Sequence, residues 1–253
     1  MNTFDTQPQQ PQFTARIESS ACWVKDPFPG LFPETCGQSY VALQALFTPE
    51  RRVFGYEVLH RSGWDNCFQG DADHATQAIM KNWTFQELHG LAGGHPIFLN
   101  CPRQALVDRL LEHLAAPVVI EVLETVEPDE EVLAACRRLK ALGYQIALDD
   151  FQLSGRIGRL VELADYIKVD FRLSNREERA QIRVYLDDRP VALIAEKIET
   201  AEEFETAIQE GFQLFQGYYT ARPVIFSKCP KHMSDCTQIP DTGYPVDSGG
   251  HYL

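Results

Sequence analysis

The chain lacks the features that mark several common classes of protein. It has no excess of basic residues, because 23 Lys and Arg stand against 36 Asp and Glu, and the formal net charge is −13. A general surface for DNA, RNA or an anionic membrane needs surplus Lys and Arg to replace counterions. We therefore expect no DNA, RNA or membrane partner. An acidic chain can still hold an anionic ligand through metal ions, because carboxylates are preferred ligands of hard cations.

Signals for export and membrane insertion are also missing. The first 12 residues contain no basic cluster and no apolar stretch, and an apolar run such as Leu114–Ile120 spans only seven residues. The seven cysteines form no C-x-x-C pair and are odd in number, which argues against a disulfide framework. These absences predict a reduced, cytoplasmic protein.

The chain divides by composition into an arm, one domain and a tail. Residues 1–38 are rich in Pro, Gln and Ser and predict an N-terminal arm, whereas residues 227–253 contain few apolar residues and predict a flexible C-terminal tail. The 188 residues at 39–226 carry the periodic pattern of a folded domain. That length is slightly under the usual barrel length of roughly 200 residues, so some helices must be short or missing.

Short apolar runs alternate with helical segments along this domain. Eight strands are expected, at Val41–Phe47, Val53–Leu59, Pro96–Leu99, Pro117–Ile120, Gln145–Leu148, Tyr166–Val169, Val191–Ala195 and Gln213–Phe215. Helices are expected at Asp73–Leu88, Pro102–Leu114, Pro128–Leu142, Asn175–Leu186 and Ala201–Gln209. The turn between the first two strands is short enough to force an antiparallel pair. This order predicts an α/β fold, a TIM-like (β/α)8 barrel with one antiparallel strand. A doubly wound open sheet is the alternative, but no G-x-G-x-x-G or P-loop follows a strand.

Acid, amide or amine side chains end six strands in succession, from the third to the eighth, and Glu57 lies within the second, all at positions that would meet at one mouth of a barrel. They are Glu57, Asn100, Glu121, Asp149, Asp150, Lys168, Asp170, Glu196, Glu199 and Gln216. Carboxylates so close together repel one another unless cations or protons neutralise them. Oxygen-rich clusters suit Mg²⁺ or Mn²⁺, and a lysine among them would position a water or stabilise developing charge. The pattern predicts a metal-dependent hydrolase or lyase acting on a phosphate-containing substrate.

Seven motifs in the family's order resemble those of EAL domains, the phosphodiesterases that open cyclic di-GMP in bacterial second-messenger signalling. They are Glu57-Val-Leu-His-Arg61, Leu99-Asn100, Glu121-Val-Leu-Glu124, Ala147-Leu-Asp-Asp-Phe151, Ile167-Lys-Val-Asp170, Ala195-Glu-Lys-Ile-Glu199 and Phe215-Gln-Gly-Tyr218. The resemblance spans roughly residues 39–226, and its sequence motifs look like those of the EAL branch that is often joined to HDOD domains. We expect no HDOD domain within residues 227–253.

The resemblance implies a role for each residue of the mouth. Two Mg²⁺ or Mn²⁺ ions would be held by Glu57, Asn100, Glu121, Asp149, Asp150 and Glu196 and would activate a water. Lys168 would hold or help deprotonate that water, which makes Lys168, Glu57 and Glu196 the catalytic residues. Arg61 would pair with a phosphate, Glu199 would face a guanine edge, and Asp170 and Gln216 would support the substrate site. Glu124 would brace the loop after Asp149 and Asp150. The product would be linear pGpG, and the loop at 149–155 could join two barrels in a homodimer.

Two positions depart from the family pattern, and both replace glycine. Gln152 stands where the family has the glycine of D-D-F-G, whose role is a backbone angle that glycine adopts at low cost. Lys197 stands where the family has the glycine of A-E-G-V-E. Its side chain could pair with substrate phosphate or point outward, and lysine favours the outward position. Because the first departure bears on catalysis, two alternatives remain beside the phosphodiesterase: a cyclic di-GMP receptor with slow or no hydrolysis, and an interaction module that has lost the ligand.

Overall fold

The computed structural model describes residues 39–63, 72–109, 111, 114, 118–153, 156–187 and 189–228. The predicted arm at 1–38 and residues 229–253 of the predicted tail lie outside these ranges.

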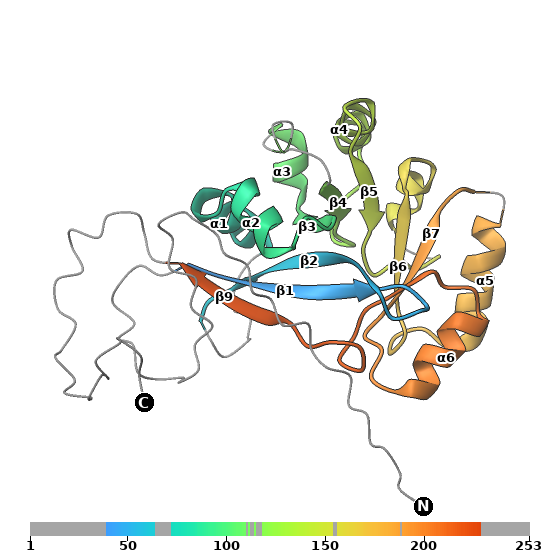
Figure 1. The fold of residues 1–253 in the computed structure, drawn as a ribbon. Helices are drawn as coiled ribbons and strands as arrows, with labels where there is room; N and C mark the ends of the chain where they lie inside the picture. Colours follow the sequence, from blue (N-terminus) through green and yellow to red (C-terminus); the bar gives the residue numbers. More distant parts are fainter. Residues whose placement is uncertain are drawn as a thin grey trace, which may run out of the picture.

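Eight strands close into a barrel, which confirms the fold predicted from the sequence (Figure 1). β1 (Ser39–Phe47) runs antiparallel to β2 (Val53–Arg61), and from β2 onward each strand pairs in parallel with the next. The later strands are β3 (Ile97–Cys101), β4 (Val118–Val122), β5 (Gln145–Leu148), β6 (Tyr166–Asp170), β7 (Ala192–Glu196) and β8 (Leu214–Phe215). Pairing of Phe47 with Phe215 joins β1 to β8 and closes the ring, with β1 as the reversed strand.

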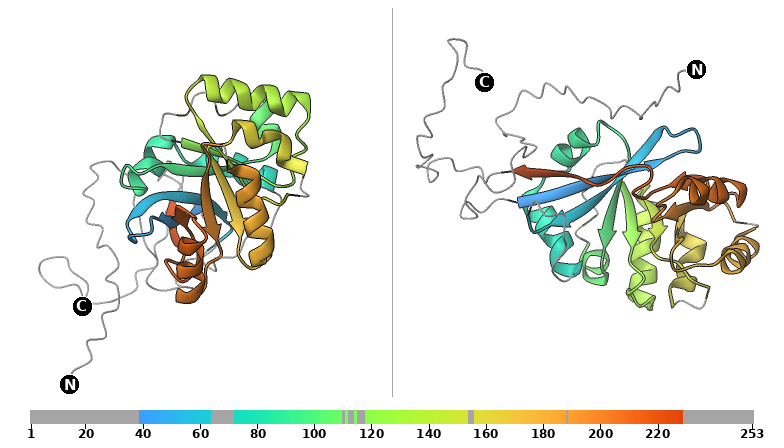
Figure 2. Two further views of the ribbon diagram at one scale, coloured as in Figure 1. Left: turned by 90° about the vertical axis from the view of Figure 1, so that its right-hand side faces the viewer. Right: turned by 90° about the horizontal axis from the view of Figure 1, so that it is seen from below.

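Helices follow most of the strands and pack on the outside of the barrel. They are α1 (Ala72–Asn82), α2 (Phe85–Leu91), α3 (Arg103–Val107), α4 (Glu130–Ala141), the 3₁₀ helix η1 (Arg156–Leu163), α5 (Arg176–Leu186) and α6 (Ala201–Gln209). Figures 1 and 2 show these helices gathered along one side, with β1 and β2 along the other. None of the helices in the described ranges has the length and apolar character that a bilayer crossing requires.

The structure corrects the extent of two predicted helices. The helix expected at 73–88 is two helices, because Thr84 and Glu87 exchange side-chain to backbone hydrogen bonds in a capping box that starts α2. The helix expected at 102–114 covers only Arg103–Val107. Arg109 takes a left-handed φ of 59°, a conformation that a right-handed helix cannot continue through.

Two elements were not expected from the sequence. η1 connects β5 to β6 in place of an α-helix, in keeping with the short length of the domain. β9 (Val224–Lys228) pairs antiparallel with the first half of β1. Its last residue, Lys228, donates to Glu87 Oε2 over 2.5 Å and lies 5.2 Å from the ring centroid of Trp83. The apolar run Val224–Phe226 is only three residues long, too short to predict a strand.

The interior of the barrel is built in two layers, because alternate residues of a strand face the same side. The lower layer is apolar and contains Leu46, Phe98, Val119, Ala147, Tyr166, Ile194 and Leu214. Two residues further along β3, β4, β6 and β7 come Asn100, Glu121, Lys168 and Glu196. The same alternation that fills the barrel with apolar side chains therefore stacks a polar layer directly above them, at the carboxyl ends of the strands.

The loops after β7 and β8 pack tightly against each other beside this polar layer. Gln216 accepts a backbone hydrogen bond from Ile198 over 3.1 Å, and Ile198 accepts one from Tyr219 over 3.0 Å. Gly217 lies between them, and a Cβ added there would be 2.2 Å from the backbone N and O atoms of Ile198. Only a residue without a side chain fits this crossing.

Replacing Gly217 with alanine is expected to lower the free energy of unfolding by about 1–3 kcal/mol or more, because backbone atoms must move to relieve the overlap. Urea unfolding followed by circular dichroism measures this change. Gly158→Ala is the matched control, since nothing lies within 4 Å of a Cβ added at Gly158. Equal stability of the two variants would show that the loops after β7 and β8 can separate at little cost.

Candidate functional site

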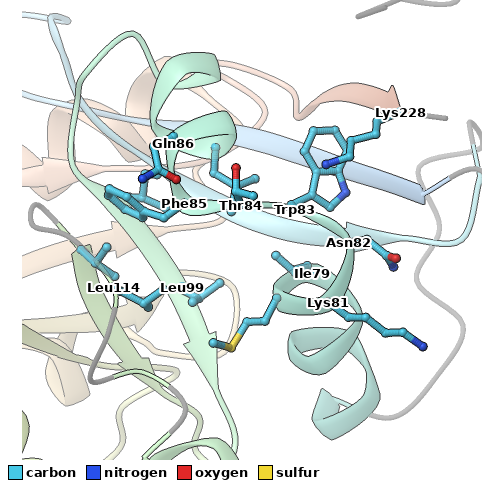
Figure 3. A pocket seen from close by; sticks show the side chains of 14 residues that line it. Ile79, Lys81, Asn82, Trp83, Thr84, Phe85, Gln86, Leu99, Leu114 and Lys228 are labelled. Atoms are coloured by element: carbon cyan, nitrogen blue, oxygen red, sulfur yellow. The ribbon is translucent and has the colours of Figure 1, made fainter. Parts of the chain in front are cut away.

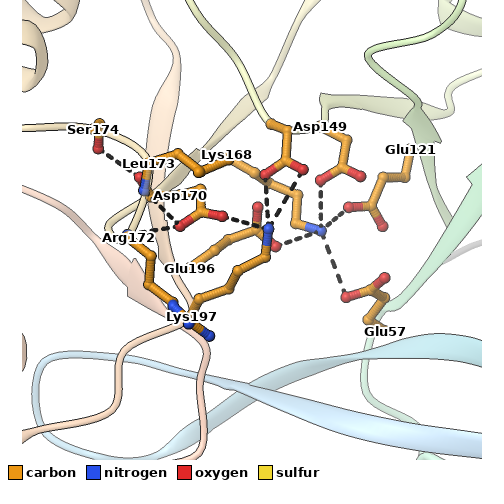
Figure 4. Close-up of polar contacts among 11 residues, drawn as sticks. Glu57, Glu121, Asp149, Lys168, Asp170, Arg172, Leu173, Ser174, Glu196 and Lys197 are labelled. Carbon is orange, nitrogen blue, oxygen red and sulfur yellow. Dashed lines mark hydrogen bonds and ion pairs between the residues drawn. The ribbon is translucent and has the colours of Figure 1, made fainter. Parts of the chain in front are cut away.

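Lys168 lies at the centre of the polar layer, inside a ring of four carboxylates that come from β2, β4, β7 and the residue directly after β5 (Figure 4). Its ammonium is 3.5 Å from Glu57 Oε2, 3.1 Å from Asp149 Oδ1 and 2.8 Å from Glu196 Oε1, and it also pairs with Glu121. The Lys168 side chain is only 2% exposed. The structure thus brings together residues that are up to 139 positions apart, from Glu57 to Glu196, as the sequence predicts.

Two amides fix the orientation of Glu57. Asn100 Nδ2 donates to Glu57 Oε1 over 2.9 Å, and Gln216 Nε2 donates to Glu57 Oε2 over 2.8 Å. Both carboxylate oxygens of Glu57 are therefore held, one by each amide. Asn100 and Gln216, predicted as a metal ligand and as a support for the substrate site, both lie in direct contact with the ring.

Burial and crowding shift the ionisation of the ring. Burial raises the pKa of Glu121 and of Glu196 well above the ordinary value of 4.5, and nearby carboxylates add to the rise while Lys168 opposes it. Burial lowers the pKa of Lys168, but attraction to Asp149, Glu121 and Glu196 outweighs it, so the pKa lies well above 10.5. The lysine is therefore a cation at neutral pH, and it is a single positive charge among four acidic groups.

The ring suits a divalent metal ion. Glu57, Glu121 and Glu196 each offer a carboxylate oxygen, and these oxygens lie within 4.8 Å of one another. Glu121 Oε2 and Glu196 Oε2 are buried without a hydrogen-bond partner among the described residues. Buried carboxylate oxygens are costly unless a cation or donor satisfies them. An all-oxygen donor set of this kind fits Mg²⁺ or Mn²⁺.

A second polar group lies beside the ring, around Lys197. Its ammonium pairs with Asp170 and lies 3.3 Å from Asp150 Oδ1 and 3.5 Å from Asp150 Oδ2 (Figure 4). Lys197 stays partly exposed, as expected for lysine, but its side chain is not free, because the two aspartates hold its ammonium at the mouth. Burial lowers its pKa, but the bond to Asp170 and the charge of Asp150 outweigh this and raise the pKa to about 12. The feature of the sequence that could have indicated this contact is the lysine directly after Glu196, where the family has glycine.

The backbone near Gln152 also bears on the departure from the family pattern. Near the mouth, a left-handed φ occurs at Asp150, at 39°, and at Lys197, at 57°, but not at Gln152. Gln152 therefore does not adopt the backbone angle attributed to the family's glycine, and the effect of this departure on activity stays a prediction. The unfavourable conformations lie instead at the two residues that pair across the mouth.

The remaining predicted residues surround this centre. Asp170 Oδ1 accepts from the backbone N–H groups of Arg172 and Leu173 over 2.7 and 3.2 Å. Glu199 is about half exposed and its Oε1 accepts from Arg172 over 3.1 Å. Arg61 ends β2, buried and on the same face as Glu57.

Glu124 lies at the edge of the mouth. It offers a carboxylate oxygen within 4.8 Å of oxygens of Asp149 and Asp150. Burial raises its pKa, with a further rise from those two aspartates. Its predicted role in bracing the following loop stays a prediction, since residues 154 and 155 are not described.

A cavity of about 530 Å³ lies outside the barrel, against α1 and α2 (Figure 3). Trp83, Thr84, Phe85 and Leu99 are among the residues that line it. Leu99 and Asn100 are neighbours on β3 and face opposite sides of the sheet, so the strand separates the cavity from the ring. No acid of the ring lines it, and it is not the candidate active site.

Comparison with known proteins gives consistent results. The family model described as EAL domain matches residues 73–223. The uncharacterized protein YuxH of Bacillus subtilis is 33% identical over 196 residues, which are 74% of this chain and 48% of YuxH. The cyclic di-GMP phosphodiesterase CdgJ of Vibrio cholerae is 31% identical over 225 residues, which are 85% of this chain and 52% of CdgJ. The chain therefore spans about half the length of these relatives.

Solved structures share the fold. Klebsiella pneumoniae BlrP1, in a manganese and cyclic di-GMP complex, is 26% identical with a TM-score of 0.61, over 83% of this chain and 61% of that chain. Bacillus subtilis YkuI, a protein with an EAL domain solved with cyclic di-GMP and calcium, has a TM-score of 0.60 at 24% identity, over 73% of this chain and 54% of that chain. With more than half of its residues matched by the family model and the expected side chains gathered at the mouth of its barrel, the chain belongs to the EAL domain family.

Proposed function

We propose that this chain is a metal-dependent phosphodiesterase that hydrolyses cyclic di-GMP to linear pGpG. The observation that carries the proposal is the ring of Glu57, Glu121, Asp149 and Glu196 around Lys168. Two relatives support it: CdgJ is named for this activity, and BlrP1 has been solved with manganese and cyclic di-GMP.

The proposed cofactor is a pair of Mg²⁺ or Mn²⁺ ions. Their ligands would be the residues predicted from the sequence, Glu57, Asn100, Glu121, Asp149, Asp150 and Glu196. When bound, such ions polarise a phosphodiester and lower the pKa of a water. The buried, unpartnered oxygens of Glu121 and Glu196 support this assignment.

The chain's own side chains would bind and orient the substrate. Lys168 carries three N–H donors at the centre of the ring and can hold a water and stabilise negative charge at phosphorus. Arg61 would pair bidentately with a phosphate, because the guanidinium fork matches its oxygens. Glu199 would accept from a guanine edge. Gln216 would keep Glu57 aligned, and Asp170 would hold the loop that carries Arg172.

A cyclic di-GMP receptor with little turnover is the second candidate, and the contact between Lys197 and Asp150 favours it. Asp150 is one of the six proposed metal ligands, and it already has a cation beside it. A site with reduced room for metal would still bind the ligand through Arg61 and Glu199, but its rate of hydrolysis would fall.

The purified protein with Mn²⁺ is expected to convert cyclic di-GMP to pGpG, and EDTA is expected to stop the reaction. Glu57→Ala should lower the rate by about 10²-fold or more, because it removes a proposed ligand. Liquid chromatography of the nucleotides measures both results. Glu202→Gln, an exposed change on α6, is the matched control and should keep the full rate.

Absence of pGpG from a folded protein would contradict the proposal. If cyclic di-GMP still bound in EDTA, that result would select the receptor. Membership of the branch joined to HDOD domains, dimerisation through the loop at 149–155 and a cytoplasmic location stay predictions.

A further inference from the structure

Lys197 provides a second cation at the mouth, separate from Lys168. Lys168 is buried within the ring of four carboxylates, whereas Lys197 is 45% exposed and lies over Asp150 and Asp170 (Figure 4). Two groups of acids at the mouth thus each pair with a lysine of their own. The inner group carries four carboxylates and the outer group two.

The position of Lys197 is specified by the chain around it. Asp170 cannot turn away, because two backbone N–H groups hold its Oδ1 while its Oδ2 accepts from Lys197. The backbone of Lys197 has a φ of 57°, which is unfavourable for a residue with a Cβ. A lysine kept in such a conformation, with its ammonium against two aspartates, is not a freely moving surface side chain.

The charge of Lys197 bears directly on metal binding. Its ammonium lies 3.3 and 3.5 Å from the two oxygens of Asp150, which are the oxygens that a metal ion in the outer group would need. A divalent ion there would meet a positive charge at close range, and an interaction between charges a few ångströms apart is strong where water is partly excluded. The ion avoids this repulsion only if the ammonium of Lys197 moves away from Asp150.

We propose that Lys197 is a built-in cation of the outer group, which takes the place of a second metal ion and weakens binding of that ion. The chain then binds one divalent ion tightly in the inner group and a second one much more weakly. This inference rests on the metal site of the proposed function, but it does not depend on turnover.

The test is a titration of the full chain with Mn²⁺, followed by calorimetry and by the electron paramagnetic resonance signal of free Mn²⁺. The unmodified protein is expected to bind one ion at least tenfold more tightly than a second. Lys197→Met removes the charge at similar length and should strengthen the weaker site at least tenfold, which is about 1.4 kcal/mol. Lys197→Gly removes the charge and also the cost of a positive φ, because glycine adopts that angle freely. It should strengthen the weaker site by the same factor, and it serves as the test if the methionine variant folds poorly.

Lys81→Met is the matched control, because it removes one positive charge from the exposed surface of α1. It should leave both binding constants within twofold. Two sites of equal affinity in the unmodified protein would overturn the inference. It would also be overturned if, in both Lys197 variants, the binding constant of the weaker site stayed within threefold of the original. Absence of any Mn²⁺ binding would overturn it together with the metal site. The expected binding pattern without pGpG formation would support the inference and contradict only the proposed hydrolysis.

Discussion

Replacing Lys168 with methionine is expected to lower the free energy of unfolding of the metal-free protein by about 3–5 kcal/mol. The ammonium pairs with Glu57, Glu121, Asp149 and Glu196 and is almost fully buried. Methionine fills a similar volume without the charge. The four carboxylates would then face one another in a buried site with their repulsion uncompensated, so unfolding or protonation would become more favourable.

Divalent metal is expected to reverse much of this loss. Mn²⁺ would bind the folded Lys168→Met protein and not the unfolded chain, so it raises the free energy of unfolding by mass action. Turnover of cyclic di-GMP should stay at least 10²-fold below that of the unmodified protein even when metal has restored the fold. Stability and catalysis would thus respond differently to metal, which separates the two roles of Lys168.

Urea unfolding in EDTA and in Mn²⁺ measures the stability effect. Lys140→Met is the matched control, because Lys140 pairs with Asp165 near the other end of β6 and is one-third exposed. Loss of such a partly exposed pair should cost only about 1 kcal/mol or less, with no dependence on metal. If the Lys168→Met protein lost no more stability in EDTA than this control, the lysine would not be needed to stabilise the ring of carboxylates.

The barrel and its acidic mouth could be predicted from the sequence because both follow from a period of two along parallel strands. Each apolar residue such as Phe98 or Val119 marks the inward face of its strand, so Asn100 and Glu121, two residues later, must face inward as well. Since all the strands from β2 to β8 end at the same side, the residues that end them meet. Position along a strand was therefore enough to predict that Glu121, Lys168 and Glu196 meet, whereas Glu57 joins them from the middle of the longer strand β2.

Features that depend on competition between local interactions could not be predicted in the same way. The capping box at Thr84 interrupts a helical period that is otherwise continuous, and β9 is held through Lys228 and the edge of β1 rather than by a long apolar run. Lys197 is held at the mouth, although still partly exposed, because it pairs with Asp150 and Asp170, 47 and 27 residues away. Such a contact is visible only once the strands are placed.

Replacing Glu121 with glutamine is expected to act on stability in the opposite direction to the change at Lys168. Glu121 is fully buried, and burial together with Glu57, Asp149 and Glu196 raises its pKa well above 4.5 despite Lys168. In the folded protein the ionised form is thus disfavoured relative to the unfolded chain. A group whose folded pKa is raised in this way binds more protons in the folded state, so stability falls as pH rises from its unfolded pKa towards its folded pKa.

Glutamine cannot ionise, so the stability of the variant does not fall in this way as the pH rises. The difference in free energy of unfolding, variant minus unmodified protein in EDTA, should be smallest near pH 4.5. It should grow in favour of the variant by up to about 1.4 kcal/mol for each pH unit above that value, until the pKa of folded Glu121 is passed. At the same time Mn²⁺ affinity should fall by about 10²-fold or more, because an uncharged amide replaces a proposed ligand.

Urea unfolding at a series of pH values and a Mn²⁺ titration measure the two effects. Glu202→Gln makes the same chemical change at an exposed site on α6 and should alter neither quantity. A Glu121→Gln protein whose stability advantage shrank as the pH rose would contradict the raised pKa, and one that bound Mn²⁺ unchanged would exclude Glu121 as a ligand. The expected result, a more stable metal-free protein that no longer binds metal, would mean that this ring is kept at a cost to the fold, as is common where charged groups are gathered for chemistry rather than for packing.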